Sequence, residues 1–443
     1  MKTKRLSSGH YLMLSFIVLI LTGTLFLKIP VSTYSGISWI NALFTATSAV
    51  CVTGLTSVDT ASTFTITGQI IILLLIQFGG IGIMTFAAMF IFSFNKKLSV
   101  SNRVMMEDSF IQGASDFKLS DFVRFIVKYT LIFEGAGAIL FFVLLDEKNL
   151  FKRLYFSIFH SISAFCNAGF STYSDNLVRY SQNAAVNITT MVLIVSGGIG
   201  FFVMFEIKTK VKSFFVKESA SQQNYYFFSL HTWIVLVTTV ILITGGAFLI
   251  YSFETHSGGN ISFLQAFFQS VTSRTAGFNT IDISSLNHGT LLIIMVLMFI
   301  GGSPGSTAGG IKTSTFAIIF SIIFMGRNNF KDVVIRNRHI PRKNVIHALV
   351  VFVFAFNIVM VSTVLIIFFH PEKDIMSVLF ESVSAFGTVG LSTGITSSLN
   401  GSAKLVIIAT MFCGRIGTLT IFSLFLLRKD NPVKYAEERI MVG

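Results

Sequence analysis

Long and short apolar segments alternate along the chain. Eight segments have about 20 residues or more, the length that crosses about 30 Å of hydrocarbon as an α-helix. They lie near residues 11–29, 66–94, 121–145, 186–207, 230–252, 288–325, 345–369 and 403–427. The first ends without a small-x-small cleavage pattern, so we interpret it as a retained span rather than a signal peptide. The pattern predicts an all-α integral membrane protein.

A shorter apolar segment ending in small residues lies between the two members of each pair of spans. These segments cover residues 37–50, 151–165, 261–273 and 375–386. At about 1.5 Å per residue, some 14 residues reach only about 20 Å, too short to cross the bilayer. We therefore expect re-entrant half-helices, so that each unit consists of a span, a pore helix and a second span.

The ends of the four half-helices are similar to one another. Each has a glycine, a phenylalanine ten residues before it, and a hydroxyl residue five or six residues before it. The glycines are Gly54, Gly169, Gly277 and Gly390, the phenylalanines are Phe44, Phe159, Phe267 and Phe380, and the hydroxyl residues are Ser48, Ser163, Thr272 and Ser384. This periodicity predicts four repeats, at 1–100, 101–217, 218–330 and 331–443, the last with a short cytoplasmic tail.

A second similarity lies in the span after each half-helix. We align Gly79-Gly-Ile-Gly82, Gly197-Gly-Ile-Gly200, Gly309-Gly-Ile-Lys312 and Gly414-Arg-Ile-Gly417. Because each repeat has two spans, all four repeats enter the membrane in the same orientation. Parallel repeats around a central axis form a pore, whereas many alternating-access carriers use inverted repeats.

The residues at the end of each half-helix suit a cation. The half-helix directs the partially negative end of its dipole into the membrane. The next residues are non-helical, which hydrocarbon tolerates only where they line a cavity, and their carbonyls can replace the water around an ion. Glycines at four equivalent positions favour this interpretation over turns or packing sites. We predict a selectivity filter with a cation at the carbonyls of Val52, Thr53, Gly54, Asn167, Ala168, Gly169, Thr275, Ala276, Gly277, Thr388, Val389 and Gly390.

Small and polar residues interrupt the sixth span between 301 and 313. The segment is similar to a phosphate-binding loop, but Ile311 separates Gly310 from Lys312 and no strand precedes it, so we expect no bound nucleotide. Small polar residues at this depth are expected to line a water cavity; the alternative is a helix kink at Pro304. The residues concerned are Gly301, Gly302, Ser303, Pro304, Gly305, Ser306, Gly309, Gly310 and Lys312, together with Arg415 from the fourth repeat.

Two arginines at membrane depth need a cavity or a partner. Arg415 aligns with Gly310, beside this interruption, where its charge would slow cations. The alternative is a packing ion pair with an acid such as Glu134 or Glu381. Arg274 precedes the third filter and would repel a cation if it lined the pore. We expect it behind the filter, paired with a pore-helix acid such as Glu381.

The distribution of charge excludes several other functions. The chain is 53% hydrophobic and 12% charged, with a net charge of +13. The basic residues lie mostly on one side of the predicted spans, 22 against 7, which places both termini in the cytoplasm and removes the argument for nucleic acid. His160, Cys166 and Asn167 lie near one another without an arranged general base, so we expect no enzyme. The apolar surface indicates the lipid bilayer as a partner.

The filter motifs, especially Gly387-Thr-Val-Gly-Leu391, resemble those of the Trk/Ktr/HKT superfamily of K⁺ transporters. The resemblance covers essentially the whole chain, whose length and short tails are similar to the bacterial Ktr membrane subunit (KtrB or KtrD type). It implies a K⁺-channel-like fold in a bacterial cell membrane, with a gate below the filter formed by the interruption of the sixth span and Arg415. It also implies a homodimer with one pore per protomer and gating by a cytosolic nucleotide-binding ring (KtrA- or KtrC-like).

The resemblance also bears on the choice of ion. Relatives with Ser at the position of Gly54 tend to pass Na⁺, so Gly54 indicates K⁺. Whether Na⁺ is co-transported or only activates stays open. The alternative function is a secondary transporter of another small cationic solute. Such a carrier would favour inverted halves and a mid-membrane polar site, neither of which the sequence contains.

Overall fold

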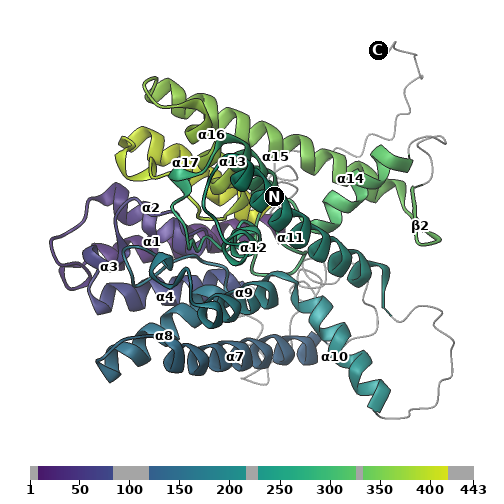
Figure 1. Cartoon of the computed structure of the whole chain (residues 1–443), viewed down its shortest axis with the longest axis horizontal. Helices are drawn as coiled ribbons and strands as arrows, with labels where there is room; N and C mark the ends of the chain where they lie inside the picture. Colours follow the sequence, from purple (N-terminus) through teal and green to yellow (C-terminus); the bar gives the residue numbers. More distant parts are fainter. Residues whose placement is uncertain (1–7, 83–118, 216–227, 326–332, 418–443) are drawn as a thin grey trace, which may run out of the picture.

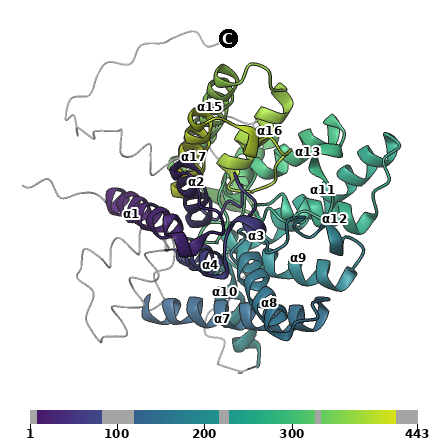
Figure 2. The same cartoon turned by 90° about the vertical axis from the view of Figure 1, so that its left-hand side faces the viewer.

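The computed structural model describes residues 8–82, 119–215, 228–325 and 333–417. Figure 2 shows the purple, blue, teal and green segments following one another around a common centre. In Figure 1, α7 and α15 run lengthwise along opposite edges of the molecule. The four units that the sequence predicts therefore surround one axis. Their exact boundaries stay a prediction.

Each unit begins with a long apolar helix and continues with a half-helix. The long helices are α1 (Ser8–Lys28), α7 (Leu119–Leu144), α11 (Leu230–His256) and α15 (Arg342–Phe369). By length and composition all four can cross a membrane. The half-helices are α2 (Trp39–Val50), α8 (Leu150–Phe165), α12 (Phe263–Thr272) and α16 (Ile375–Gly387). The bounds of α8 and α16 differ from the predicted half-helices by one residue, and those of α2 and α12 by at most two.

The third helix of each unit is shorter than its apolar run. These helices are α4 (Ile66–Ile81), α9 (Ala184–Gly198), α13 (His288–Phe299) and α17 (Gly401–Ile416). Within the part of the chain that the structure describes, α9 is followed by α10 (Phe201–Phe215) and α13 by α14 (Thr313–Met325). The ends of two predicted spans, 83–94 and 418–427, lie outside the described residues, as does most of the basic loop at 95–120.

Side chains that cap helix N-termini explain why these helices begin where they do. A cap oxygen accepts a hydrogen bond from a backbone N–H of the first turn, which has no partner within the helix. The half-helices are capped by Ser38, Asn149, Ser262 and Asp374, and the third helices by Thr65, Asn183, Asn287 and Asn400. In every repeat, a capping side chain thus marks the first turn of both the half-helix and the helix that follows the filter loop.

The run near 186–207 was predicted as one span, and this prediction is wrong. The helix stops at Gly198, and α10 begins at Phe201 with its axis turned by 96°. Gly200, between them, has φ +101°, a conformation that a side chain strongly disfavours. The backbone groups freed by the break are bonded to the third repeat, as described below.

The remaining elements are short. Helix α3 (Thr60–Thr63) and the 3₁₀ turns η1 (Pro30–Ser32), η2 (Val178–Tyr180), η3 (Ile283–Ser285) and η4 (Thr396–Ser398) belong to connecting loops. Strands β1 (Val333–Ile335) and β2 (Arg338–Ile340) form an antiparallel hairpin in which Val333 pairs with Ile340. The all-α prediction did not include this hairpin, whose two turn residues Arg336 and Asn337 both have positive φ.

Candidate ion path

The four motif glycines form a closed ring at the centre of the molecule. A Cβ atom added to any of them would lie closer than 3.0 Å to a backbone carbonyl oxygen of the next repeat. The carbonyls met in this way belong to Ala168 for Gly54, Ala276 for Gly169, Val389 for Gly277 and Thr53 for Gly390. The order runs from repeat one to four and back to one, so only glycine lets the four loops converge.

The backbone conformation is the same in all four loops. The residue two before each glycine has positive φ: Val52 (55°), Asn167 (60°), Thr275 (78°) and Thr388 (49°). The glycines themselves have φ of +89°, +67°, +75° and +94° in chain order. A β-branched residue in this region is a genuine outlier, with a cost of order 1–3 kcal/mol, and such strain clusters at functional sites. The sequence predicted positive φ only at the glycines.

The hydroxyl residues of the motif hold the loops in place. Ser48 accepts a hydrogen bond from the Gly54 N–H (3.0 Å), and Ser384 accepts one from the Gly390 N–H (3.1 Å). In the other two repeats the hydroxyl donates instead. Ser163 donates to the Phe170 carbonyl and Thr272 to the Phe278 carbonyl, both at 2.7 Å. Each pore helix is thus tied to the far end of its own loop.

The carbonyl groups of the loops are largely unpaired. Among the described residues, eleven of the twelve predicted filter residues accept no hydrogen bond at the backbone oxygen, and only Gly169 accepts one, from the Asn176 amide. All of these residues except Gly390 are buried. Buried carbonyls are normally paired, because leaving one without a partner costs free energy. Oxygen atoms of this kind suit a dehydrated cation.

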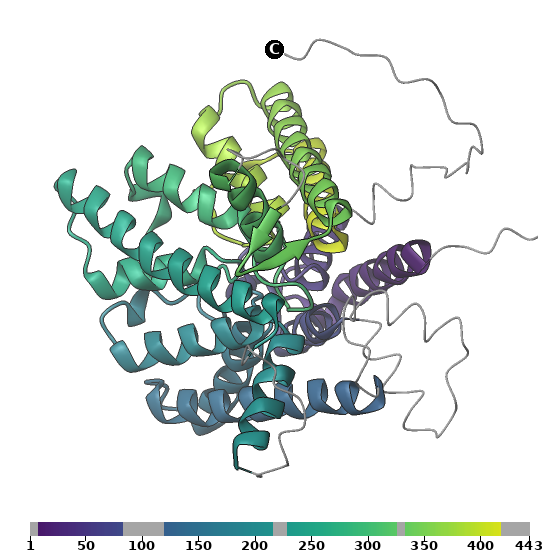
Figure 3. The same ribbon diagram turned by 90° about the vertical axis from the view of Figure 1, so that its right-hand side faces the viewer.

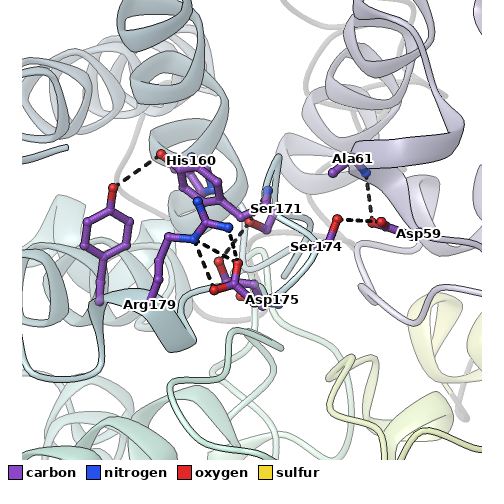
Figure 4. A network of polar contacts seen from close by, with 10 residues as sticks. Asp59, Ala61, His160, Ser171, Ser174, Asp175 and Arg179 are labelled. Carbon is purple, nitrogen blue, oxygen red and sulfur yellow. Dashed lines mark hydrogen bonds and ion pairs between the residues drawn. The ribbon is translucent and has the colours of Figure 1, made fainter. Parts of the chain in front are cut away.

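A cavity of about 180 Å³ lies on the side of the ring that the loops following the filter enclose. All four motif glycines line it, together with Asp59, Thr60, Ser174 and other polar residues. Ser174 donates to the Asp59 carboxylate at 2.6 Å and so joins the loops of repeats one and two (Figure 4). Burial alone would raise the pKa of Asp59, but hydrogen bonds from Ser174, Ser62 and the backbone bring this pKa below its usual value.

An ion pair stands beside this cavity. The Arg179 guanidinium lies 2.7 Å from an Asp175 carboxylate oxygen and stacks 4.2 Å from the Tyr173 ring centre (Figure 4). Partial burial opposes ionisation of Asp175, yet Arg179 holds its pKa below the usual value. Asp59, which lines the cavity, has no basic partner of this kind among the described residues. Its carboxylate accepts hydrogen bonds from neutral donors only.

On the opposite side of the ring, residues 300–312 form the predicted interruption between α13 and α14. Gly309 approaches the Thr388 side chain and Gly310 approaches Gly387, so the loop lies directly against the fourth filter. The Lys312 ammonium donates to the Ala308 carbonyl at 2.7 Å, which turns this side chain back onto the loop. The structure therefore brings the predicted loop and filter residues together. Their role as a gate stays a prediction.

Arg415 contacts the same loop from the fourth repeat. Its guanidinium donates to the Thr307 carbonyl and to the Gly79 and Gly80 carbonyls of α4. The alternative ion pair with Glu134 or Glu381 does not form. The Glu134 carboxylate instead accepts from the Gln77 amide, at 3.0 and 3.1 Å, and from the Cys166 thiol at 3.8 Å.

Comparison with known proteins agrees with this arrangement. The model of the TrkH family, described as a cation transport protein, matches residues 10–435. The chain belongs to the TrkH family. It is 34% identical to Ktr system potassium uptake protein B of Bacillus subtilis over 450 residues, covering 100% of this chain and 98% of the relative. It is 36% identical to potassium uptake protein D of the same organism, with 99% and 98% covered.

Two further comparisons concern ions and fold. The chain is 35% identical to the potassium/sodium uptake protein NtpJ of Enterococcus hirae, covering 99% of this chain and 98% of that protein. The crystal structure of the potassium transporter TrkH from Vibrio parahaemolyticus superposes with a TM-score of 0.73 at 21% identity, covering 96% of this chain and 86% of that one. This likeness establishes the fold. As a TrkH-family cation transport protein, the chain is not an enzyme.

The third repeat of this TrkH-family chain departs from the predicted alignment. Phe267 is only partly buried, whereas its neighbour Phe268 is fully buried, as Phe44, Phe159 and Phe380 are. The segment from the buried phenylalanine to the filter glycine is thus one residue shorter here. Six residues after that phenylalanine stand Val50, Phe165, Phe386 and, in the third repeat, Arg274.

This offset explains why the predicted pair of Arg274 and Glu381 is wrong. Arg274 replaces an apolar residue at the end of a pore helix, and its guanidinium donates to the Gly301 carbonyl at 3.3 Å. The Glu381 carboxylate is instead occupied by the Ser392 and Thr396 hydroxyls. Arg274 therefore contacts the predicted gate loop, a contact that no sequence spacing indicated.

The second predicted alignment also changes. Three glycines lie thirteen residues after the first residue of their helix. A Cβ atom on any of them would collide with a backbone carbonyl at the end of a pore helix; the pairs are Gly79 with Val50, Gly197 with Phe165 and Gly414 with Phe386. In α13 that position is Gly301, not the predicted Gly309. Its Cβ would meet the Gly309 carbonyl. The loop is therefore an insertion, and Arg415 corresponds to Gly302 rather than Gly310.

Thr307 is the residue that the sequence analysis missed. Its N–H donates to the Gly197 carbonyl (3.3 Å), its hydroxyl donates to the Phe165 carbonyl (3.4 Å), and its carbonyl accepts from Arg415. It is fully buried. A hydroxyl residue in the middle of a glycine-rich loop was a signal that could have marked it.

Proposed function

We propose that this chain is the ion-translocating membrane subunit of a K⁺ uptake system. The observation that carries the proposal is the closed ring of four glycine loops with eleven unpaired carbonyls. A K⁺ ion that enters the ring exchanges water oxygens for backbone oxygens of equal polarity, so dehydration is offset. The names of three relatives, potassium uptake proteins B and D and the potassium/sodium protein NtpJ, support K⁺ as the principal ion.

The ring geometry argues against the second candidate, a secondary transporter of another small cationic solute. Its narrowest part is built from backbone, with a glycine Cα of one repeat close to that of the next. A larger organic cation needs a roomy site of mixed polar and apolar side chains. A membrane potential of 100 mV supplies about 2.3 kcal/mol per unit charge, enough to drive K⁺ inward without hydrolysis of ATP.

In the proposed mechanism, ions collect in the outer cavity beside Asp59 and pass through the ring. The loop 300–312 and the Arg415 guanidinium lie on the inner side and act as the gate. The loop obstructs the path, and the arginine adds an electrostatic barrier to a cation. The kink alternative at Pro304 gains no support, because Pro304 lies within thirteen non-helical residues rather than within a helix.

The assembly and orientation are part of the same proposal. The basic residues predict that both termini face the cytoplasm of a bacterial cell and that the outer cavity faces outward. The family resemblance implies a homodimer and a cytosolic nucleotide-binding regulatory ring. NtpJ supports a role for Na⁺, as a second transported ion or an activator.

Growth in low K⁺ of a cell that lacks its own K⁺ uptake tests the proposal. The chain, expressed with its cytosolic partner, restores growth, and Gly54→Asp, Gly169→Asp, Gly277→Asp or Gly390→Asp abolishes the rescue. Gly36→Asp is the matched control, since Gly36 also has positive φ (+77°) but has open space around it. If the wild type gives no rescue and no K⁺ flux, the proposal fails.

A further inference from the structure

Helix α10 leaves the helical assembly at its edge. It starts beside the centre, crosses the N-terminal end of α7, and its C-terminal end protrudes past α7 in both Figure 1 and Figure 3. Its axis is turned by 96° from that of α9. The proposed topology puts this end of α7 at the cytoplasmic surface, so α10 lies along the inner headgroup region rather than across the membrane.

The first half of α10 is anchored to its neighbours. Phe205 packs edge-on against Phe122 and Phe125 of α7, with ring centres 5.6 and 5.1 Å apart. Glu206 is buried and accepts hydrogen bonds from the N–H and hydroxyl of Ser229, the N-terminal cap of α11, both at 2.6 Å. Apolar packing and a buried carboxylate thus fix this half between repeats two and three.

The second half of α10 is basic and exposed. Lys208, Lys210 and Lys212 follow the buried carboxylate, Lys208 and Lys212 are exposed, and Val211 between them is 47% exposed. The Lys208 ammonium lies 5.0 Å from the centre of the Phe125 ring, so this charge stands at the end of α7. On α7, Arg124 and Lys128 are also exposed, and the Arg124 guanidinium lies 3.7 Å from the Asp121 carboxylate.

The N-terminal end of α10 and the residues just before it are hydrogen-bonded to the proposed gate loop, residues 300–312. The Phe201 N–H donates to the Gly305 carbonyl at 2.9 Å, and the Ser303 N–H donates to the Gly198 carbonyl at 3.0 Å. A third bond joins the Thr307 N–H to the Gly197 carbonyl. These bonds satisfy backbone groups that the break in the helix leaves open, so the loop cannot shift away from α10 without losing them.

We propose that α10 is a lipid-responsive lever: its lysine-bearing half binds the anionic phospholipid headgroups of the cytoplasmic leaflet, and its position sets the gate loop. This inference rests on the proposed K⁺ conduction and gating. A basic helix in the plane of the interface is attracted to anionic lipid, and each lysine near the surface strengthens that attraction about fivefold. A membrane occupant is favoured over a protein because the lysines lie where α10 protrudes at the edge of the assembly.

Flux measurements in vesicles of defined composition test this lever. The full chain is reconstituted into phosphatidylcholine alone, and into phosphatidylcholine mixed with phosphatidylglycerol, and K⁺ flux is recorded in each. We expect flux to rise several-fold with phosphatidylglycerol. The triple variant Lys208→Gln, Lys210→Gln, Lys212→Gln loses this rise, whereas the corresponding triple Arg variant keeps it. The variant Lys148→Gln, Lys152→Gln, exposed at the other end of the molecule, also keeps it.

The outcomes separate the two proposals. No K⁺ flux in either lipid, from protein that elutes as a folded species, overturns the proposed function. Flux that is equal in both lipids overturns the lever while leaving the proposed function standing. A lysine dependence that appears only when the cytosolic partner is added also overturns it, since α10 would then be a protein-docking helix. Binding of phosphatidylglycerol in a native mass spectrum, lost in the Gln variant and kept in the Arg variant, supports the lipid site independently of flux.

Discussion

Arg415 of the fourth repeat donates a hydrogen bond to the carbonyl oxygen of Thr307 in the third. The hydroxyl of the same threonine donates to the Phe165 carbonyl at the end of the second pore helix. Through Thr307, the loop 300–312 therefore contacts both the second and the fourth repeat. Its conformation depends on contacts that are distant in sequence, and this dependence makes the loop suitable as a movable element.

Removing the charge of Arg415 should raise basal K⁺ flux. In Arg415→Ala the loop loses one anchor and the inner side of the ring loses a fixed positive charge. A barrier lowered by about 1.4 kcal/mol corresponds to about tenfold more flux. Flux of the purified chain in vesicles measures this. Arg415→Lys keeps the charge without the forked geometry and should lie between the two, and equal flux in all three proteins would contradict the electrostatic role.

Shortening the loop should have a similar effect by a steric route. Deletion of 303–310 removes the Thr307 contacts and opens the inner side of the ring, so K⁺ flux should increase and respond less to the cytosolic partner. Thr307→Val is the milder version, since it keeps the shape and removes only the hydroxyl bond to Phe165. If the deletion leaves both the flux and its regulation unchanged, the loop is not a gate.

The helix glycines should be needed for stability rather than for selectivity. In Gly197→Ala the new methyl group collides with the Phe165 carbonyl, and overpacking of this kind costs about 1–3 kcal/mol. We expect a lower midpoint of thermal unfolding in detergent. The control is Gly245→Ala in α11, which has nothing within 4 Å of the added Cβ and should leave the midpoint unchanged or slightly raised. A Gly197→Ala protein as stable as the wild type would show that the α9–α8 contact is loose.

The filter serines should control selectivity. Ser384→Ala leaves the partly buried Gly390 N–H without its acceptor, and the loss of a hydrogen bond of this kind costs about 1 kcal/mol. The loop then relaxes, and the preference for K⁺ over Na⁺ should fall by at least several-fold in competition flux assays. Ser398→Ala is the control, since this serine lies in the outer loop at η4. Unchanged selectivity in Ser384→Ala would show that the ring is held by its glycine contacts alone.

Asp59 should help collect K⁺ without making uptake sensitive to pH. Its pKa lies below the usual value, so the carboxylate is fully ionised near neutral pH and becomes protonated only as the pH falls through that lowered pKa. Uptake should therefore not vary through Asp59 between about pH 5 and 8. Asp59→Asn should raise the K⁺ concentration for half-maximal uptake and leave the maximal rate unchanged. A change in the maximal rate alone would contradict a role in capture.

Much of this architecture could be predicted from local patterns in the sequence. The half-helices were placed to within two residues, because a short apolar run that ends in small residues is a local signal. The ring of four filter glycines followed from their equivalent positions, and the loop at 301–313 from its composition. Each of these features depends on residues that are neighbours in the chain.

Only the tertiary structure decided how the repeats differ and how they are joined. The bonds at the bend between α9 and α10 and the three bonds of Thr307 pair polar groups of different repeats. The bond from Arg274 to Gly301 joins two distant segments of the third repeat. Polar groups inside a membrane protein must find partners within the protein. The sequence offered more than one possible partner for each arginine at membrane depth. Which one is used depends on distances across the ring, and these are set by packing rather than by spacing along the chain.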